Sequence, residues 1–284
     1  MTLQTNYQRL QDNLAYLKLK QCILHLDETI ELANKQNLSH IEWLLKLSDY
    51  EVDIKRQNVI NHMVKISNFP HLKTLADFEF SFQPQINEVQ IKNLASLGFM
   101  ERAENIVFLG SSGVGKTHLA TSLGIESSRN RRSTYFIKCH DLIQNLKRAK
   151  DEGKLETRLK HYTRYQLLII DEIGYLPLQP GDANLLFQII DRRYEQKSTI
   201  VTSNINFDEW ATILHDERVA NAIVDRLLHH AHVISITGDS YRLRNHWYFI
   251  FSKIRFNYFH ISRMSTTIIT LVIFIIYIHN FLKI

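Results

Sequence analysis

The feature that most constrains this 284-residue chain is a glycine-rich segment that follows an apolar run and precedes a helix-forming one. The segment Gly110-Ser-Ser-Gly-Val-Gly-Lys-Thr117 satisfies the pattern G-x-x-x-x-G-K-[ST]. The run Asn105–Leu109 before it predicts a buried strand, and Lys116–Glu126 after it predicts a helix. The pattern requires this strand–loop–helix context, so we predict a phosphate-binding P-loop.

The residue types of the loop fit a nucleoside triphosphate. Glycines at three positions allow a tight turn that exposes backbone N–H groups to phosphate oxygens, and the following helix points its positive end the same way. Lys116 can reach the β- and γ-phosphates, and Thr117 offers a hydroxyl ligand to Mg²⁺. ATP and Mg²⁺ are therefore the expected ligands. The residues predicted to bind ATP are Gly110, Ser111, Ser112, Gly113, Val114, Gly115, Lys116 and Thr117.

A second part of the site is predicted where two other apolar runs end. Leu167–Ile170 predicts a buried strand, and Asp171 and Glu172 follow it directly. Ligands bind at the carboxyl ends of strands in open α/β sheets, so Asp171 suits Mg²⁺, directly or through water. Glu172 suits a general base that orients the attacking water. Asn204, after the run Thr199–Thr202, is placed to hydrogen-bond the γ-phosphate or that water. The alternatives are a solvated acidic turn and a strand-capping asparagine.

The chain around these motifs alternates short apolar runs with helix-forming segments. This alternation predicts an α/β fold whose parallel sheet is covered by helices on both faces. The predicted strands are Asn105–Leu109, Thr134–Lys138, Leu167–Ile170, Thr199–Thr202 and Val233–Ile236. The predicted helices are Lys116–Glu126, Asp141–Lys150, Gly181–Glu195, Phe207–Leu214 and Glu217–His229.

Residues 1–70 predict a small all-α domain. Pro70 is the first proline, and apolar residues recur at helical spacing before it. The sequence leaves open whether this domain packs on the main one or serves self-association or partner docking. Phe69–Gln85, with alternating phenylalanines between two prolines, predicts a linker that lies against the next domain. The predicted buried stripe consists of Leu10, Leu14, Leu17, Ile23, Leu26, Ile30, Ile41, Leu44, Leu45 and Leu47.

Positive charge is concentrated in one central stretch. The net charge is +5, but residues 129–164 alone carry eleven basic and four acidic side chains. This stretch is a candidate nucleic-acid surface, with a solvated helical face as the alternative. Arg226, on a predicted helix, suits either a surface ion pair or an arginine finger for a neighbouring subunit's ATP. His229, His230 and His232 have no carboxylate or cysteine to complete a metal set, so they are interpreted as packing or interface residues.

Five segments, in order, resemble the IstB-like transposition helper ATPases, which are relatives of the DnaC and DnaI helicase loaders. They are GSSGVGKTHLA (110–120), LLIIDEIGYLPL (167–178), RRYEQKSTIVTSN (192–204), DRLLHHAHVI (225–234) and GDSYRLR (238–244). The P-loop is generic, whereas His118, the GYLPL run and the SYRLR ending are specific. The resemblance implies a P-loop AAA+ three-layer core after a helical N-terminal domain. It also implies Mg²⁺-dependent ATP hydrolysis stimulated by DNA, homo-oligomerisation on duplex DNA in the ATP state, and regulation of a transposase in insertion-sequence transposition.

The resemblance also implies roles for individual residues. His118 joins the ATP-binding set, and Arg242 falls near where some relatives place a second sensing arginine. Asp171 and Glu172 correspond to the Walker B pair, Asn204 to the sensor and Arg226 to the trans-acting finger. The implied catalytic residues are Glu172, Asn204 and Arg226, the metal ligands are Thr117 and Asp171, and the DNA contacts are Arg129, Arg131, Arg132, Lys147 and Arg148.

Other interpretations stay open on the same motifs. A replicative helicase loader has the same chemistry with a helicase as its partner, and a decayed module would bind ATP or DNA without hydrolysis. A membrane-tethered protein would rest on Ser265–Leu282 alone, a marginal span that Thr, Tyr, His and Asn dilute. Two isolated cysteines and the absence of an apolar signal core at the N-terminus favour a cytoplasmic protein.

The end of the chain departs from the family pattern. The resemblance ends near Arg244, and residues 245–284 carry four basic and no acidic side chains. Out-of-frame or read-through sequence is the preferred interpretation of this tail, and a membrane anchor and a packed extra element are the others. The expected division is therefore a helical oligomerisation or partner domain at 1–70, an ATPase domain at 71–244 and an atypical apolar tail at 245–284.

Overall fold

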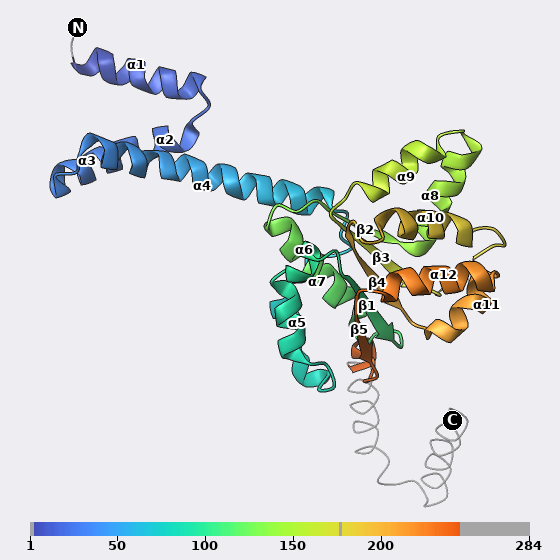
Figure 1. Cartoon of the computed structure of the whole chain (residues 1–284). Helices are drawn as coiled ribbons and strands as arrows, with labels where there is room; N and C mark the ends of the chain where they lie inside the picture. The colour runs from blue at the N-terminus through green and yellow to red at the C-terminus, as the bar shows by residue number, and fades with distance from the viewer. Residues whose placement is uncertain (1–2, 176–177, 245–284) are drawn as a thin grey trace, which may run out of the picture.

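The computed structural model describes residues 3–175 and 178–244, which form a three-layer α/β body with a helical arm at the N-terminus (Figure 1). The strands of the body are β1 (Asn105–Gly110), β2 (Thr134–Lys138), β3 (Leu167–Ile173), β4 (Ser198–Ser203) and β5 (Ala231–Ile236). Among the described residues they form one five-stranded sheet in the order β2-β3-β4-β1-β5. Each neighbouring pair is parallel, as the alternation of strands and helices predicts.

Helices cover both faces of this sheet, and each face has its own apolar core. The helices are α5 (Glu88–Ala95), α6 (Gly98–Glu101), α7 (Lys116–Arg129), α8 (Cys139–Asp151), α9 (Leu155–Thr163), α10 (Ala183–Arg193), α11 (Trp210–Leu214) and α12 (Glu217–Leu228). On one face α5, α6 and α7 pack against side chains such as Phe108 and Ile169. On the other, α8 to α12 pack against side chains such as Ile170 and Val201. Figure 1 shows the two groups on opposite sides of the strands.

The predicted strands are all present, with ends that shift by at most three residues. The predicted helix Phe207–Leu214 is instead a 3₁₀ turn, Phe207–Glu209, followed by the short α11. Helices α5, α6 and α9 were not predicted. They are short, and α9 buries only Leu159 and Tyr162 while its other side chains are charged, polar or half-exposed. Two buried apolar residues give too little helical periodicity in the sequence to predict the helix.

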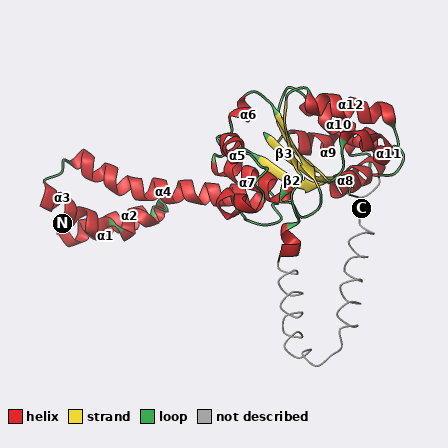
Figure 2. Ribbon diagram, turned by 90° about the horizontal axis from the view of Figure 1, so that it is seen from below, coloured by secondary structure: helices red, strands yellow, loops and turns green. Residues whose placement is uncertain are grey.

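Residues 3–66 form the helical arm. The helices are α1 (Leu3–Tyr16), α2 (Lys20–Leu24), α3 (Leu26–Gln36) and α4 (His40–Ile66). Asn37 adopts the left-handed conformation that ends α3, and Ser39 starts α4 with a reciprocal capping box to Glu42. Figures 1 and 2 both show α1 to α3 folded back along the first part of α4, away from the body.

The C-terminal end of α4 joins the arm to the body. The Ser67 hydroxyl lies 2.9 Å from the Ser128 hydroxyl at the end of α7. The Phe136 N–H, on edge strand β2, donates to the Ser67 carbonyl over 2.8 Å, and the Asn68 side chain donates to the Phe136 carbonyl over 3.1 Å. The arm is therefore fixed at this junction to both a helix and the sheet edge.

The predicted buried stripe of the arm is confirmed at Leu26 and Leu47 but wrong for half of its residues. The arm's buried apolar residues are Cys22, Leu26 and Leu47, with Leu14 and Ile30 partly buried beside them. Three helices pack on one side of the first part of α4, and the C-terminal end of α4 packs on α7, so other faces of its first part stay exposed. The predicted core residues that are exposed are Leu10, Leu17, Ile41, Leu44 and Leu45, of which Ile41 is 81% exposed.

Within residues 3–175 and 178–244, no helix is both long and apolar enough to span a membrane. The marginal span Ser265–Leu282, and the whole tail 245–284 with its read-through interpretation, lie outside the described residues.

Candidate functional site

The P-loop joins the end of β1 to the start of α7, as the sequence predicts. Gly110, Gly113 and Gly115 have φ values of 146°, 86° and 105°, in a region that residues other than glycine rarely adopt. A Cβ on Gly115 would lie only 2.6 Å from the Phe78 ring. The loop therefore requires glycine both for its backbone conformation and for the close approach of the linker.

Lys116 is buried at the centre of this loop. Its Nζ donates to the carbonyls of Gly110 and Ser111 over 2.6 and 2.7 Å. Burial lowers the pKa of Lys116, and Asp171 and Glu172 act in the opposite direction. The ammonium group has no carboxylate bound to it among the described residues, so its charge is available to an anion that enters the loop.

Asp171 lies near the carboxyl end of the inner strand β3, beside the P-loop. It is 1% exposed, and the hydroxyls of Thr117 and Thr202 donate to its Oδ1 over 2.9 and 2.6 Å. Burial raises the pKa of Asp171, while these two hydrogen bonds oppose the shift. A hydroxyl and a carboxylate in contact are the oxygen ligands that Mg²⁺ prefers, so the pair fits a metal bound next to phosphate.

Glu172 has a strained backbone that turns its side chain away from the strand. Its φ is 62°, and the register between β3 and β4 is irregular between Ile170 and Ile173. The Glu172 N–H donates to the Thr202 hydroxyl over 2.9 Å. The carboxylate pairs with the Lys138 ammonium over 2.9 Å, which raises the pKa of Lys138. Strain of this kind is common at active sites, where it positions a reacting group.

These residues line one cavity of about 490 Å³. Its walls bring together the P-loop, Asp171, Glu172 and Asn204, as predicted from the sequence. The opposite wall comes from the linker at 70–83 and from Tyr241 and Arg242 near the end of the described chain. A cavity of this size and mixed polarity is typical of small-molecule sites.

The linker wall is tied to the P-loop by His118. The His118 Nε2 lies 2.8 Å from the Thr74 carbonyl, and the Phe78 ring meets the His118 ring edge-on at 5.2 Å. Burial lowers the pKa of His118. Glu79 pairs with Arg244 across the same wall. The linker thus lies against the body, as the sequence predicts, and its Phe78 and Phe82 side chains line the cavity.

The sequence did not single out several residues that the fold brings to this cavity. Lys138 comes from the end of β2. The Thr202 hydroxyl, two residues before Asn204, donates to the Asp171 carboxylate and accepts from the Glu172 backbone N–H. A parallel sheet brings the carboxyl ends of its strands together. The position of Lys138 at the end of a predicted strand could therefore have marked it as a residue of this cavity. The contribution of His71 and Phe78 depends on how the linker folds back, which the local sequence does not specify.

Arg226 lies far from its own P-loop. It is in the last turn of α12, at the sheet edge where β1 and β5 begin, whereas the P-loop follows the end of β1. A six-residue strand spans about 17–20 Å. Its guanidinium pairs with Asp191 over 2.9 Å and lies 4.8 Å from the centre of the Phe187 ring.

The five basic residues predicted to contact DNA fall into two groups on opposite faces of the sheet. Arg129, Arg131 and Arg132 lie at the end of α7, where Arg132 pairs with Glu101. Lys147 and Arg148 lie on α8. Lys147 is held by Asp182 over 3.2 Å and by Gln179 over 2.7 Å. The structure therefore does not join these residues into one surface.

Arg148 belongs to a basic cluster within the stretch 129–164, the candidate nucleic-acid surface predicted from the sequence. It lines a cavity of about 260 Å³ between α8 and α9 together with Lys154, Arg158 and His161. Within the described residues, neither Arg148 nor Arg158 forms an ion pair. Burial and the nearby Arg164 and Arg158 lower the pKa of His161, and Lys154 pairs with Glu152 over 3.4 Å, so among the described side chains the cavity's unpaired positive charge comes from the two arginines.

Comparison with known proteins identifies the family. The family model described as IstB-like ATP binding protein matches residues 12–248. The chain belongs to this family. An ATP-binding protein of insertion sequence IS232 from Bacillus thuringiensis subsp. berliner is 58% identical over 245 residues, covering 86% of this chain and 98% of that protein. Its counterpart in IS21 of Pseudomonas aeruginosa is 40% identical over 231 residues, covering 81% and 87%.

Solved structures agree on the fold. The structure of DnaI matches with a TM-score of 0.50 and 20% identity, covering 62% of this chain and 94% of DnaI. The replication initiator DnaA, bound to AMPPCP and single-stranded DNA, matches with a TM-score of 0.51 and 20% identity, covering 61% and 52%. This IstB-like chain therefore has a P-loop AAA+ fold and belongs to the nucleotide-binding ATPase class, as the motifs and their order predict.

Proposed function

We propose that this IstB-like protein is a Mg²⁺-dependent ATPase that oligomerises on duplex DNA, is stimulated by it, and regulates a transposase in insertion-sequence transposition. The observation that carries the proposal is Glu172, held at the mouth of the cavity that also contains Lys116 and the Thr117–Asp171 pair. Similarity to insertion-sequence ATP-binding proteins supports the transposition context. In this proposal residues 1–70 serve oligomerisation or partner docking, residues 71–244 form the ATPase domain, and the protein acts in the cytoplasm.

The arrangement supports hydrolysis by distinct contributions from each side chain. Lys116 binds the β- and γ-phosphates, and Glu172 accepts a proton from the attacking water and orients it. Asn204, exposed at the end of β4, hydrogen-bonds the γ-phosphate or that water. Mg²⁺ held by Thr117 and Asp171 would neutralise charge on the phosphates. The test is ATP turnover by the full chain with and without duplex DNA; absence of turnover with ATP still bound would favour a non-hydrolysing module.

Lys138 offers a route by which DNA controls hydrolysis. It pairs with Glu172 and immediately precedes α8, the helix that carries Arg148. While the ion pair persists, Glu172 is turned toward an ammonium group instead of toward water. Binding of DNA at α8 and α9 would shift the end of β2 and release the carboxylate.

Lys138→Met is therefore expected to raise hydrolysis in the absence of DNA and to reduce the stimulation by DNA. A half-exposed ion pair is worth about 0.2–1 kcal/mol, so the rise is expected to reach at most about fivefold. The measurement is the steady-state rate with and without saturating duplex DNA. Lys92→Met is a matched control, because Lys92 pairs with Glu88 over 2.7 Å on α5, away from the site. A fall in the rate without DNA would instead mean that Lys138 supports catalysis.

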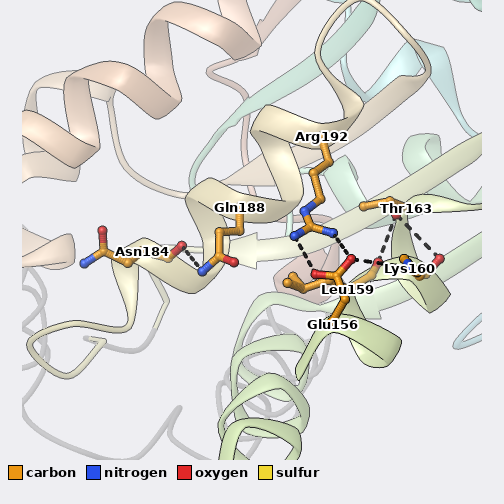
Figure 3. Close-up of polar contacts among 7 residues, drawn as sticks. All are labelled: Glu156, Leu159, Lys160, Thr163, Asn184, Gln188 and Arg192. Atoms are coloured by element: carbon orange, nitrogen blue, oxygen red, sulfur yellow. Dashed lines mark hydrogen bonds and ion pairs between the residues drawn. The ribbon is translucent and has the colours of Figure 1, made fainter. Parts of the chain in front are cut away.

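The cavity between α8 and α9 is our candidate for phosphate contacts with DNA. Glu152 also lines this cavity, but it pairs with Lys154 over 3.4 Å. Among the described residues neither Arg148 nor Arg158 forms an ion pair. Helix α9 is fixed against α10 by the two-pronged pair of Arg192 with Glu156, at 2.9 and 2.8 Å (Figure 3). A fixed basic surface positions a protein on DNA through phosphate contacts without reading sequence.

Arg148→Ala combined with Arg158→Ala is expected to weaken binding to all duplex sequences by a similar factor. The slope of log affinity against log salt concentration should fall by about one for each lost phosphate contact. Fluorescence anisotropy with a labelled duplex at several salt concentrations measures both quantities. Arg129→Ala combined with Arg131→Ala is the matched pair on the opposite face. A larger loss of DNA affinity from that second pair of substitutions would mean that the DNA-binding surface lies at the end of α7.

A further inference from the structure

A cluster of two histidines and a glutamate lies outside the ATP site, at the opposite edge of the sheet. His229 and His230 follow the end of α12, and Glu195 lies in the turn between α10 and β4. Their candidate ligand atoms all lie within 4.8 Å of one another. From the sequence alone, the histidines are interpreted as packing or interface residues because no carboxylate completes a metal set with them. Glu195 is distant along the chain, and only the fold brings it to them.

The two distances from the Glu195 carboxylate are close to the spacing of ligand atoms around one metal ion. Glu195 Oε1 lies 3.5 Å from His229 Nδ1 and 3.8 Å from His230 Nε2. Ligand atoms around a tetrahedral Zn²⁺ lie about 3.3–3.5 Å apart, given bond lengths of about 2.0–2.2 Å. One carboxylate oxygen therefore faces both imidazoles at nearly the separation that a shared ion requires.

The backbone of Glu195 supports the same interpretation. Its φ is 55°, in the left-handed region, directly after Tyr194 ends α10. Glycine or asparagine is the usual residue at this position after a helix, because other side chains cost energy there. The same conformation occurs after α7 and α11, at Arg131 and His215, and at Glu195 it serves to place the carboxylate beside the two histidines.

The surroundings leave the site accessible and roughly balanced in charge. All three side chains are about half exposed. The nearby Arg226 is paired with Asp191, and the buried Arg193 donates to backbone carbonyls of residues 165 and 198. The Tyr194 hydroxyl lies 2.6 Å from His229 Nδ1, so metal binding at that atom must displace this hydrogen bond.

We propose that Glu195, His229 and His230 form a binding site for a divalent transition-metal ion, with Zn²⁺ as the expected occupant. Imidazole and carboxylate ligands suit Zn²⁺, Ni²⁺ and Co²⁺, whereas Mg²⁺ prefers oxygen ligands alone. Three protein ligands leave a coordination position for water or a further ligand. The ion joins the turn before β4 to the end of α12, the helix that carries Arg226. The site is separate from the ATP cavity and does not depend on ATP hydrolysis.

The test is Zn²⁺ binding by the full-length chain without nucleotide, in the presence of excess Mg²⁺. Equilibrium dialysis with metal analysis gives stoichiometry and affinity, and Co²⁺ absorption reports the ligand set. We expect one Zn²⁺ per chain at this site and a higher Tm with Zn²⁺. Glu195→Gln, and separately His229→Gln with His230→Gln, should weaken binding by more than the roughly 10–100-fold typical of losing an outer-shell partner. They should also abolish the rise in Tm.

Two further variants make the result specific. Tyr194→Phe removes the competing hydrogen bond and should keep or strengthen binding. His62→Gln, at an exposed histidine on α4, should leave binding unchanged. Absence of Zn²⁺ binding by the wild-type chain would overturn the proposal. Binding that the Glu195 and histidine variants leave intact would do so as well, because another set of the chain's histidines would then be responsible.

Discussion

Glu172→Gln is expected to lower the rate of ATP hydrolysis by about 10²–10⁴-fold and to leave ATP binding nearly unchanged. The reason is the division of work in the cavity. Lys116 and the Thr117–Asp171 pair supply the charges that hold the triphosphate and its metal, and none of them is bonded to the Glu172 carboxylate. Glutamine keeps the size of the side chain and its ability to accept a hydrogen bond, but it cannot take a proton from water.

The measurement is single-turnover hydrolysis together with equilibrium binding of a fluorescent ATP analogue. Glu209→Gln, an exposed glutamate after β4, is a matched control and should hydrolyse ATP at the wild-type rate. Lys116→Ala is a second comparison, and this variant should no longer bind ATP. If Glu172→Gln hydrolyses ATP as fast as the wild-type chain, another group activates the water and the assignment of Glu172 is wrong. If it loses ATP binding, the carboxylate has a structural role, which its ion pair with Lys138 would supply.

The parts of this site that the sequence predicted are those encoded locally. The P-loop needs only residues 110–117, and Asp171 and Glu172 are marked by the four apolar residues before them. A parallel sheet then brings these strand ends together without further information. The partners of these residues were harder to find. The Lys138–Glu172 and Glu195–His229 contacts each join residues more than thirty positions apart, and no motif spacing signals them.

The arm shows the opposite error, in which a correct local pattern led to a wrong conclusion about burial. Apolar residues do recur at helical spacing in α4, and the helix forms. Whether such a stripe is buried depends on how many neighbours the helix has, and α1 to α3 cover only one side of it. Leu44 and Leu45 therefore stay 59% exposed. Periodicity predicts the element, whereas the number of packed layers decides which of its faces is buried.

Arg226→Ala is expected to reduce DNA-stimulated hydrolysis by about 10³–10⁵-fold while each subunit still binds ATP. Arg226 cannot reach the P-loop of its own chain, because it lies at the edge where β1 begins. If it contributes to catalysis, the ATP must belong to a neighbouring subunit. Its ion pair with Asp191 and its contact with the Phe187 ring would hold the guanidinium ready at the surface before assembly.

Mixing two inactive variants separates action in trans from a purely structural role. Glu172→Gln retains Arg226, and Arg226→Ala retains Glu172, so an interface between the two has one complete site. The mixture is expected to recover a clear part of the DNA-stimulated rate that neither variant has alone. Asp191→Asn removes the internal ion pair but keeps the guanidinium, and should cost little, because exposed ion pairs contribute only about 0–1 kcal/mol. If the mixture stays inactive, or if the Asp191 variant is as impaired as Arg226→Ala, the role of Arg226 is structural and consists of holding α12 against α10.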